Sequence, residues 1–172
     1  MIIGRPATNE AAEYYWKYID QVPGADPIAA LEAQRAELRD LGAVFSEQRS
    51  LGRYAAGKWS ARESLNHVTD TERIFSVRAL WFARGFTEPL ASFDQNVAVA
   101  GAQADRLRWS SHVAEFLDVR EATLSLFRNM PDEAWSRTGV ASGNPVTVRA
   151  LAFMCAGHAT HHFKILRERY LG

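Results

Sequence analysis

Apolar residues recur at helical intervals through most of the chain, with few of the strict alternations that indicate strands. The clearest run begins after Asp26, a good N-cap, with Pro27 at the first helical position. Apolar side chains then follow at helical spacing: Ile28, Leu31, Leu38, Leu41 and Phe45. The pattern predicts a first long helix over residues 27 to about 46.

Three further long helices are predicted from residues that start or stop a helix. Ser60 and Glu63 have the spacing of a capping box, which predicts a helix from about residue 61 to 83. A third helix spans about residues 111 to 129 and ends before Pro131, which cannot continue it. Thr147 is a suitable N-cap for the last helix, which runs to about Tyr170.

Shorter elements lie between and before these helices. Residues 8 to about 19 predict a short, aromatic-rich helix, and residues 139 to 146 a small hairpin. Residues 86 to about 109 form a loop of unusual length that covers a site or contains a short helix around 94 to 100. Four amphipathic helices bury their apolar faces best in a bundle. We therefore predict a single all-α domain over residues 1–172, a four-helix bundle with a short extra N-terminal helix.

Charge and cysteine content exclude several classes of protein. The chain has 20 basic and 20 acidic residues, so its formal net charge is zero. It therefore lacks the excess of positive charge that is typical of proteins that bind nucleic acid or an anionic membrane surface. A single cysteine, Cys155, excludes an internal disulfide and fits a reducing compartment. No segment has the roughly 18 apolar residues of a membrane span, and the N-terminus lacks the apolar region of a signal peptide. We expect a cytoplasmic protein without nucleic-acid or membrane partners.

Histidines mark the candidate site. Three of the five histidines fall between residues 158 and 162, on the last helix. Because positions i and i+4 share a helix face, His158 and His162 can direct a ring nitrogen at one point. His161 competes with His162, since the spacing favours His162 only slightly. The third candidate is His67, on the second long helix, where the alternative is a core histidine bonded to a carbonyl.

The remaining candidates have plainer interpretations. His112 falls in the first turn of the third helix, where a solvated side chain is expected. Cys155 precedes His158 by one turn, but a buried free cysteine usually acts as a small apolar filler. Arg78 and Arg120 lie on largely apolar helix faces, and we expect ion-paired or snorkelling arginines there rather than recognition of an anionic substrate.

Three neutral imidazoles without a thiolate suit zinc, nickel or ferrous iron and leave coordination positions open. Open positions favour chemistry over a structural metal. A di-iron carboxylate bundle is excluded, because it needs Glu-x-x-His pairs that this sequence lacks.

Motifs along residues 25 to 172 resemble those of one known family. They are Gly57-Lys58-Trp59-Ser60 before His67, Thr71-Glu72-Arg73, Phe93-Asp94-Gln95, Val119-Arg120, Thr123-Leu124 and Gly157-His158-x-x-His161-His162. Together they resemble the DinB superfamily of damage-inducible bundle proteins. The resemblance implies an up-down-down-up bundle in which His67, His158 and His162 hold a divalent metal. It also implies a homodimer, and a low-molecular-weight thiol as cosubstrate in the relatives that are bacillithiol- or mycothiol-dependent S-transferases.

Two functions follow from these observations. The first is a metal-dependent enzyme, a thiol S-transferase or a hydrolase, that acts on a small molecule and uses the metal as a Lewis acid. No catalytic residue beyond the metal ligands is identifiable. The alternative is a non-catalytic metal-binding bundle that serves in a stress response or as an interaction protein, which the aromatic cluster at residues 14 to 19 suggests.

Overall fold

A computed structural model describes residues 3–172 and contains four long helices. They are α2 (Pro27–Val44), α4 (Ala61–Ala83), α6 (Trp109–Arg128) and α7 (Val148–Ile165), which continues as a π-helical turn over Leu166–Leu171. The predicted boundaries of these helices are confirmed within a few residues.

Side chains at the helix starts explain why the helices begin where they do. The Asp26 carboxylate accepts hydrogen bonds from two backbone amides of α2, and Pro27 needs none. Ser60 and Glu63 form the complete capping box at α4. Thr147 accepts the amide of Ala150 at the start of α7. Each cap satisfies amides that have no partner inside their helix.

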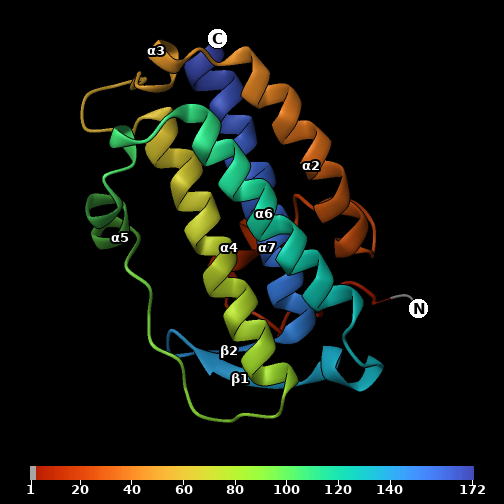
Figure 1. Cartoon of the computed structure of the whole chain (residues 1–172). Coiled ribbons are helices and arrows are strands. Elements are labelled where there is room, and N and C mark those ends of the chain that lie inside the picture. The colour runs from red at the N-terminus through yellow and green to blue at the C-terminus, as the bar shows by residue number, and fades with distance from the viewer. Residues whose placement is uncertain (1–2) are drawn as a thin grey trace.

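The four long helices pack in an up-down-down-up order, as the resemblance implies (Figure 1). In Figure 1, α2 and α7 run upward, whereas α4 and α6 run downward side by side. α4 contacts α6 and α7 along its length, and α2 contacts the same two helices from the other side. The antiparallel neighbours α4 and α7 therefore share a long interface, and this interface carries the candidate site.

A long crossover joins the parallel helices α4 and α6 along the outside of the bundle (Figure 1). It contains α5 (Gln95–Ala102), capped by Asp94, and a 3₁₀ turn over Ala104–Arg106. The short helix predicted around residues 94 to 100 is therefore present. The single-turn α3 (Glu47–Ser50) lies in the connection from α2 to α4.

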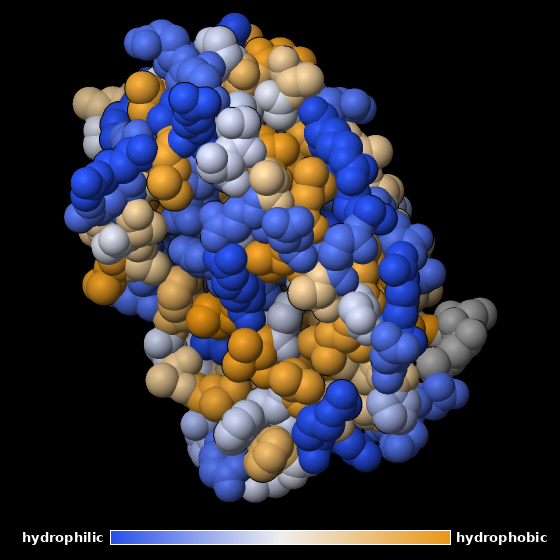
Figure 2. Space-filling view, in the orientation of Figure 1, coloured by the Kyte–Doolittle hydropathy of each residue, from blue (hydrophilic) through white to orange (hydrophobic). Residues whose placement is uncertain are grey.

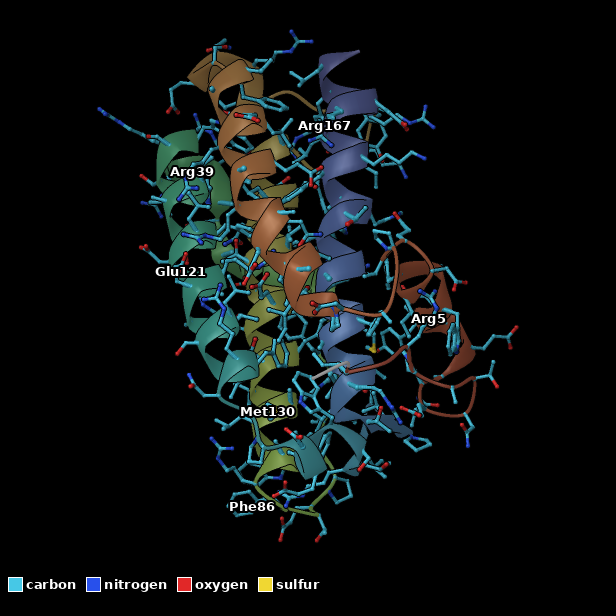
Figure 3. The ribbon with its side chains drawn as sticks, turned by 90° about the vertical axis from the view of Figure 1, so that its right-hand side faces the viewer. Arg5, Arg39, Phe86, Glu121, Met130 and Arg167 are labelled. Carbon is cyan, nitrogen blue, oxygen red and sulfur yellow. The ribbon has the colours of Figure 1, made fainter. Side chains whose placement is uncertain are left out.

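The N-terminal segment is less helical than predicted. Instead of a helix over residues 8 to 19, it has a 3₁₀ turn over Glu13–Tyr15 and the single-turn α1 (Trp16–Ile19). Arg5 holds the end of this turn by donating to the carbonyls of Ile19 and Val22. Figure 3 shows the segment beside α7, with Arg5 next to it. Tyr18 packs against His158 of α7 and Tyr15 against Phe75 of α4, and this tertiary packing rather than helix length stabilises the segment.

The predicted hairpin is formed by β1 (Thr138–Ala141) and β2 (Asn144–Thr147), which pair antiparallel before α7. A parallel bridge between Leu90 and Ala141 ties the crossover to this hairpin. The lower ends of α4 and α7 in Figure 1 are thus closed by the hairpin and the crossover together.

Charged and apolar residues are interspersed on the face shown in Figure 2, with a broken apolar patch over its lower half. On the outer side of α4, Val77 and Leu80 are exposed, and Phe86 follows shortly after the helix. None of the helices in residues 3–172 is both long and apolar enough to cross a membrane.

Candidate metal centre

Three buried histidines from two helices converge at the α4–α7 interface. His67 comes from α4, and His158 and His162 lie one turn apart on α7. One ring nitrogen from each can be chosen so that all three lie within 4.8 Å of one another. The Nε2 atoms of His67 and His158 are 3.1 Å apart. The antiparallel packing of α4 on α7 thus brings together residues 91 positions apart in the sequence.

Two hydroxyls from α4 lie beside the other ring nitrogens. The Thr71 Oγ1 atom lies 3.4 Å from Nδ1 of His67, one turn further along the same helix. The Ser64 Oγ atom lies 3.4 Å from Nδ1 of His162 on the neighbouring helix. A partner on one ring nitrogen orients the imidazole, so Thr71 supports the ring position in which Nε2 of His67 faces Nε2 of His158, and Ser64 occupies the Nδ1 side of His162.

Burial keeps the three imidazoles neutral. It lowers the pKa of His67 to about 4. It also holds the pKa of His158 and of His162 well below the ordinary value, and the neighbouring histidines add to this effect. All three rings are therefore uncharged near pH 7, which is the form that binds a metal.

The donor set fits a divalent transition metal. Two Nε2 atoms at 3.1 Å form at most one hydrogen bond, and the third ring faces them, so protein partners cannot satisfy all the inward nitrogens. Within the described residues, no carboxylate or thiol joins this group. Three neutral nitrogen ligands suit zinc, nickel or ferrous iron and leave positions for non-protein ligands.

Two cavities reach the histidines from different sides. The first has a volume of about 220 Å³ and includes His67 and His158 in its wall. Its other walls are Tyr14, Tyr15, Tyr18, Thr71, Ile74, Phe75, Arg78, Phe93, Gln95 and Ser142. The second has a volume of about 300 Å³ and includes His162. Its other walls are Tyr54, Gly57, Lys58, Trp59, Ser64, Asn96, Ile165 and Tyr170. Small molecules can therefore approach the triad from two directions.

The remaining predicted residues lie outside this group. His161 is partly exposed, and its Nδ1 lies 3.4 Å from Nε2 of Gln21. Cys155 is buried in the apolar core, as a small filler would be, and its thiol also lies beside the Glu72 carboxylate and the Arg120 guanidinium. The expectation of a solvated His112 is wrong, because the crossover covers the start of α6 and the carbonyl of Ala104 lies 2.9 Å from Nε2 of His112.

The two arginines differ from each other. Arg120 is fully buried and forms two hydrogen bonds of 2.7 Å with the Glu72 carboxylate, as expected of an ion-paired residue. Arg78 is also buried, but no carboxylate of the described residues is among its partners. It donates instead to the Ala91 carbonyl and the Ser142 hydroxyl, at 2.9 and 3.0 Å.

Sequence reasoning missed the cavity walls supplied by the N-terminal segment. Tyr14, Tyr15 and Tyr18 line the first cavity, and the Tyr18 ring packs edge-on against His158 with 5.1 Å between centroids. Their aromatic cluster was visible in the sequence, but helical periodicity does not show which face of the bundle such a segment covers.

The comparisons with known proteins agree with this architecture. A family model described as the DinB superfamily matches residues 30–166. Among solved structures, the chain is similar to YfiT from Bacillus subtilis, described as a probable metal-dependent hydrolase with an unusual four-helix bundle topology. The TM-score is 0.73 at 18% identity, over 95% of this chain and 91% of that chain, which establishes the shared fold. No curated protein matches the chain.

Proposed function

The chain belongs to the DinB superfamily, and from that premise we propose that it is a metal-dependent enzyme acting on a small molecule. His67, His158 and His162 are the proposed metal ligands. The observation that carries the proposal is the convergence of three buried, neutral imidazoles at a point that two cavities reach. Zinc, nickel and ferrous iron all match this donor set.

When bound, such a metal supplies a Lewis acid that lowers the pKa of a water molecule or of a thiol. The protein's own groups prepare the site for this chemistry. Ser64 and Thr71 orient two of the rings, and the surrounding aromatic side chains limit the access of bulk water. Burial holds the histidines neutral, so protons do not compete for the ligand nitrogens near pH 7.

Two reaction classes agree with this site, hydrolysis and thiol S-transfer. The likeness to YfiT, itself described as a probable metal-dependent hydrolase, supports the first. The presence of two cavities at one triad supports the second, because a transferase must bring a thiol and an electrophile together. Assays of the metal-loaded protein with ester or amide substrates, and with small thiols plus an electrophile, distinguish the two classes.

A non-catalytic metal-binding bundle remains the alternative. The aromatic cluster at residues 14 to 19 suggests it. Tyr18 and Ile19 of this cluster are buried against the bundle, whereas Tyr14 is 58% exposed. Turnover that disappears with a chelator would contradict this alternative.

Metal retention tests the proposed ligands directly. After loading with zinc or nickel and dialysis, we expect the His158→Ala variant to lose the metal and retain its helical circular dichroism. His161→Ala is the matched control, because His161 lies on the same helix but does not belong to the triad. This variant should retain the metal. Full metal content in dialysed His158→Ala would overturn the ligand assignment.

The homodimer implied by the family resemblance is part of the proposal. Light scattering on the purified protein measures its molar mass directly, and a mass near the 19.2 kDa of one chain would contradict a dimer.

A further inference from the structure

The first cavity contains one charged side chain that the proposed chemistry does not use. Arg78 lies in the wall of the cavity that also holds His67 and His158, and only 5% of its surface is exposed. No aspartate or glutamate lines this cavity among the described residues. Burial lowers the pKa of the Arg78 guanidinium, but an arginine stays charged near pH 7.

The partners of Arg78 leave its charge uncompensated. Its Nη2 atom donates to the Ala91 carbonyl and to the Ser142 hydroxyl, and the Tyr15 hydroxyl is a further side-chain partner of the guanidinium. None of these partners is a carboxylate. Among the described residues, the two donated hydrogen bonds both come from Nη2, and Nε and Nη1 have no carbonyl or carboxylate acceptor. Apart from the contact with Tyr15, this side of the guanidinium is available to a ligand in the cavity.

Arg120 shows how the same bundle treats a buried arginine with a structural role. Its guanidinium has a bidentate carboxylate partner, Glu72, and two further oxygen acceptors. A buried charge is costly without a counter-ion. The contrast indicates that the counter-ion of Arg78 comes from outside the chain.

The position of Arg78 relates this charge to the histidines. His67, Thr71, Ile74 and Arg78 follow one another on a single face of α4, and all line the cavity. The α-carbons of His67 and Arg78 are roughly 16 Å apart along the helix axis, and an arginine side chain in a helix leans back toward the N-terminus. A ligand anchored at Arg78 would extend toward the triad.

We propose that Arg78 binds an oxyanion, a carboxylate or a phosphate group, at the far end of a small substrate whose reacting group faces His67 and His158. The cavity of about 220 Å³ is smaller than the roughly 300–1,000 Å³ of sites for drug-sized ligands, so the substrate is metabolite-sized. This proposal rests on the proposed metal-dependent function for the reacting end and on Arg78 alone for the anionic end.

Calorimetry with two-ended probes tests the proposal. Each probe carries a hydroxamate, which binds metal ions, and a spacer of about four to eight carbon atoms, which spans ~5–10 Å. The other end is a carboxylate, a phosphonate or a neutral amide. With the zinc-loaded protein we expect one anionic probe to bind about tenfold or more tightly than the amide probe of equal length. The tighter anion identifies the oxyanion.

Variants assign the preference to the guanidinium. Arg78→Gln should abolish the anion preference, so that the anionic and amide probes bind with similar affinity, whereas Arg78→Lys should retain part of the preference. The matched control is Arg84→Gln, which removes an exposed charge from the end of α4 and should retain the full preference. Equal affinities for anionic and amide probes in the unmodified protein, or a preference that survives in Arg78→Gln, would overturn the proposal.

Metal-free protein separates this proposal from the metal site. Failure of all probes to show zinc-dependent binding would contradict the metal centre but not Arg78. In that event, NMR titration of the unmodified metal-free protein with hexanedioate decides the question. The Arg78 Nε–H resonance is assigned by its absence from the spectrum of Arg78→Gln. A saturable shift of this resonance supports an oxyanion subsite, whereas no shift at a large excess of hexanedioate overturns the proposal.

Discussion

The backbone of Gly157 on α7 lies directly against the carbonyl group of Tyr18. A Cβ built at residue 157 would overlap the carbonyl oxygen and carbon of Tyr18, so only glycine allows this approach. The contact seats α1 on the last helix, beside His158, and places the Tyr18 ring against that imidazole. The glycine before the first α7 histidine therefore shapes one wall of the candidate site.

Gly157→Ala should displace α1 and destabilise the protein by about 1–3 kcal/mol, the usual cost of overpacking a tight contact. Urea unfolding measures the change, and zinc titration shows whether the triad survives it. Gly101→Ala is the matched control, because Gly101 lies in α5 with open space around it. The control should be neutral or slightly stabilising. Equal behaviour of the two variants would show that the Tyr18 contact is not restrictive.

Glu72→Gln should destabilise the protein by about 3–5 kcal/mol, because it leaves the fully buried Arg120 charge without its counter-ion. The exposed pair of Glu32 and Arg128 offers a matched control. Glu32→Gln should cost less than about 1 kcal/mol, since solvent screens that pair. Chemical denaturation of both variants gives the comparison, and a small loss in Glu72→Gln would mean that Gln34 and nearby carbonyls suffice for Arg120.

Glu10 should make stability depend on pH through the N-terminal segment. Burial alone would raise its pKa, but hydrogen bonds from Arg149 and Thr147 outweigh this and lower the pKa below the ordinary 4.5. A lowered folded-state pKa means that the stabilisation is complete above pH 4.5 and disappears as the pH falls through the folded value. We expect the free-energy difference between the unmodified protein and Glu10→Gln to be about 1–2 kcal/mol near neutral pH.

The test is urea unfolding of both proteins over a series of pH values. The difference between them should stay constant at neutral pH and shrink below pH 4.5, because only the unmodified protein has a carboxyl group to protonate at residue 10. A difference that grows as the pH falls would contradict the assigned direction of the shift.

Cys155 should be inert toward thiol reagents in the folded protein. It is 2% exposed, and burial raises the pKa of its thiol well above the ordinary value, so the reactive thiolate is scarce near pH 8. With Ellman's reagent we expect no release of chromophore from native protein, and one thiol per chain after denaturation. Rapid reaction of the native protein would show that the centre of α7 opens readily.

Local patterns were sufficient to predict most of the bundle. The capping box at Ser60 and Glu63 marks the start of α4, and its predicted bounds coincide with those in the structure. Thr147 marks the start of α7 in the same way. Caps act through hydrogen bonds within a few residues, so their effect is readable from sequence. The order of the helices in space came instead from the family resemblance, because spacing alone does not determine which helices are neighbours.

Features that depend on tertiary packing were not predictable from spacing. The helix expected over residues 8 to 19 is reduced to single turns, since its side chains pack on both α4 and α7 rather than forming one periodic face. His112 is buried because a distant segment folds over it. The sequence predicts an ion-paired or snorkelling Arg78, whereas in the structure it donates to the Ala91 carbonyl of the crossover and the Ser142 hydroxyl of the hairpin, which spacing along α4 does not reveal.

The crossover between α4 and α6 touches both entrances to the histidines. Phe93 and Gln95 belong to the wall of one cavity, and their close neighbour Asn96 belongs to the wall of the other. The crossover carries none of the three histidines, which sit on the rigid helices α4 and α7. Changes of sequence or length in the crossover can therefore alter which molecules enter each cavity while the three histidines keep their positions. The crossover is thus the natural segment to randomise when redesigning selectivity.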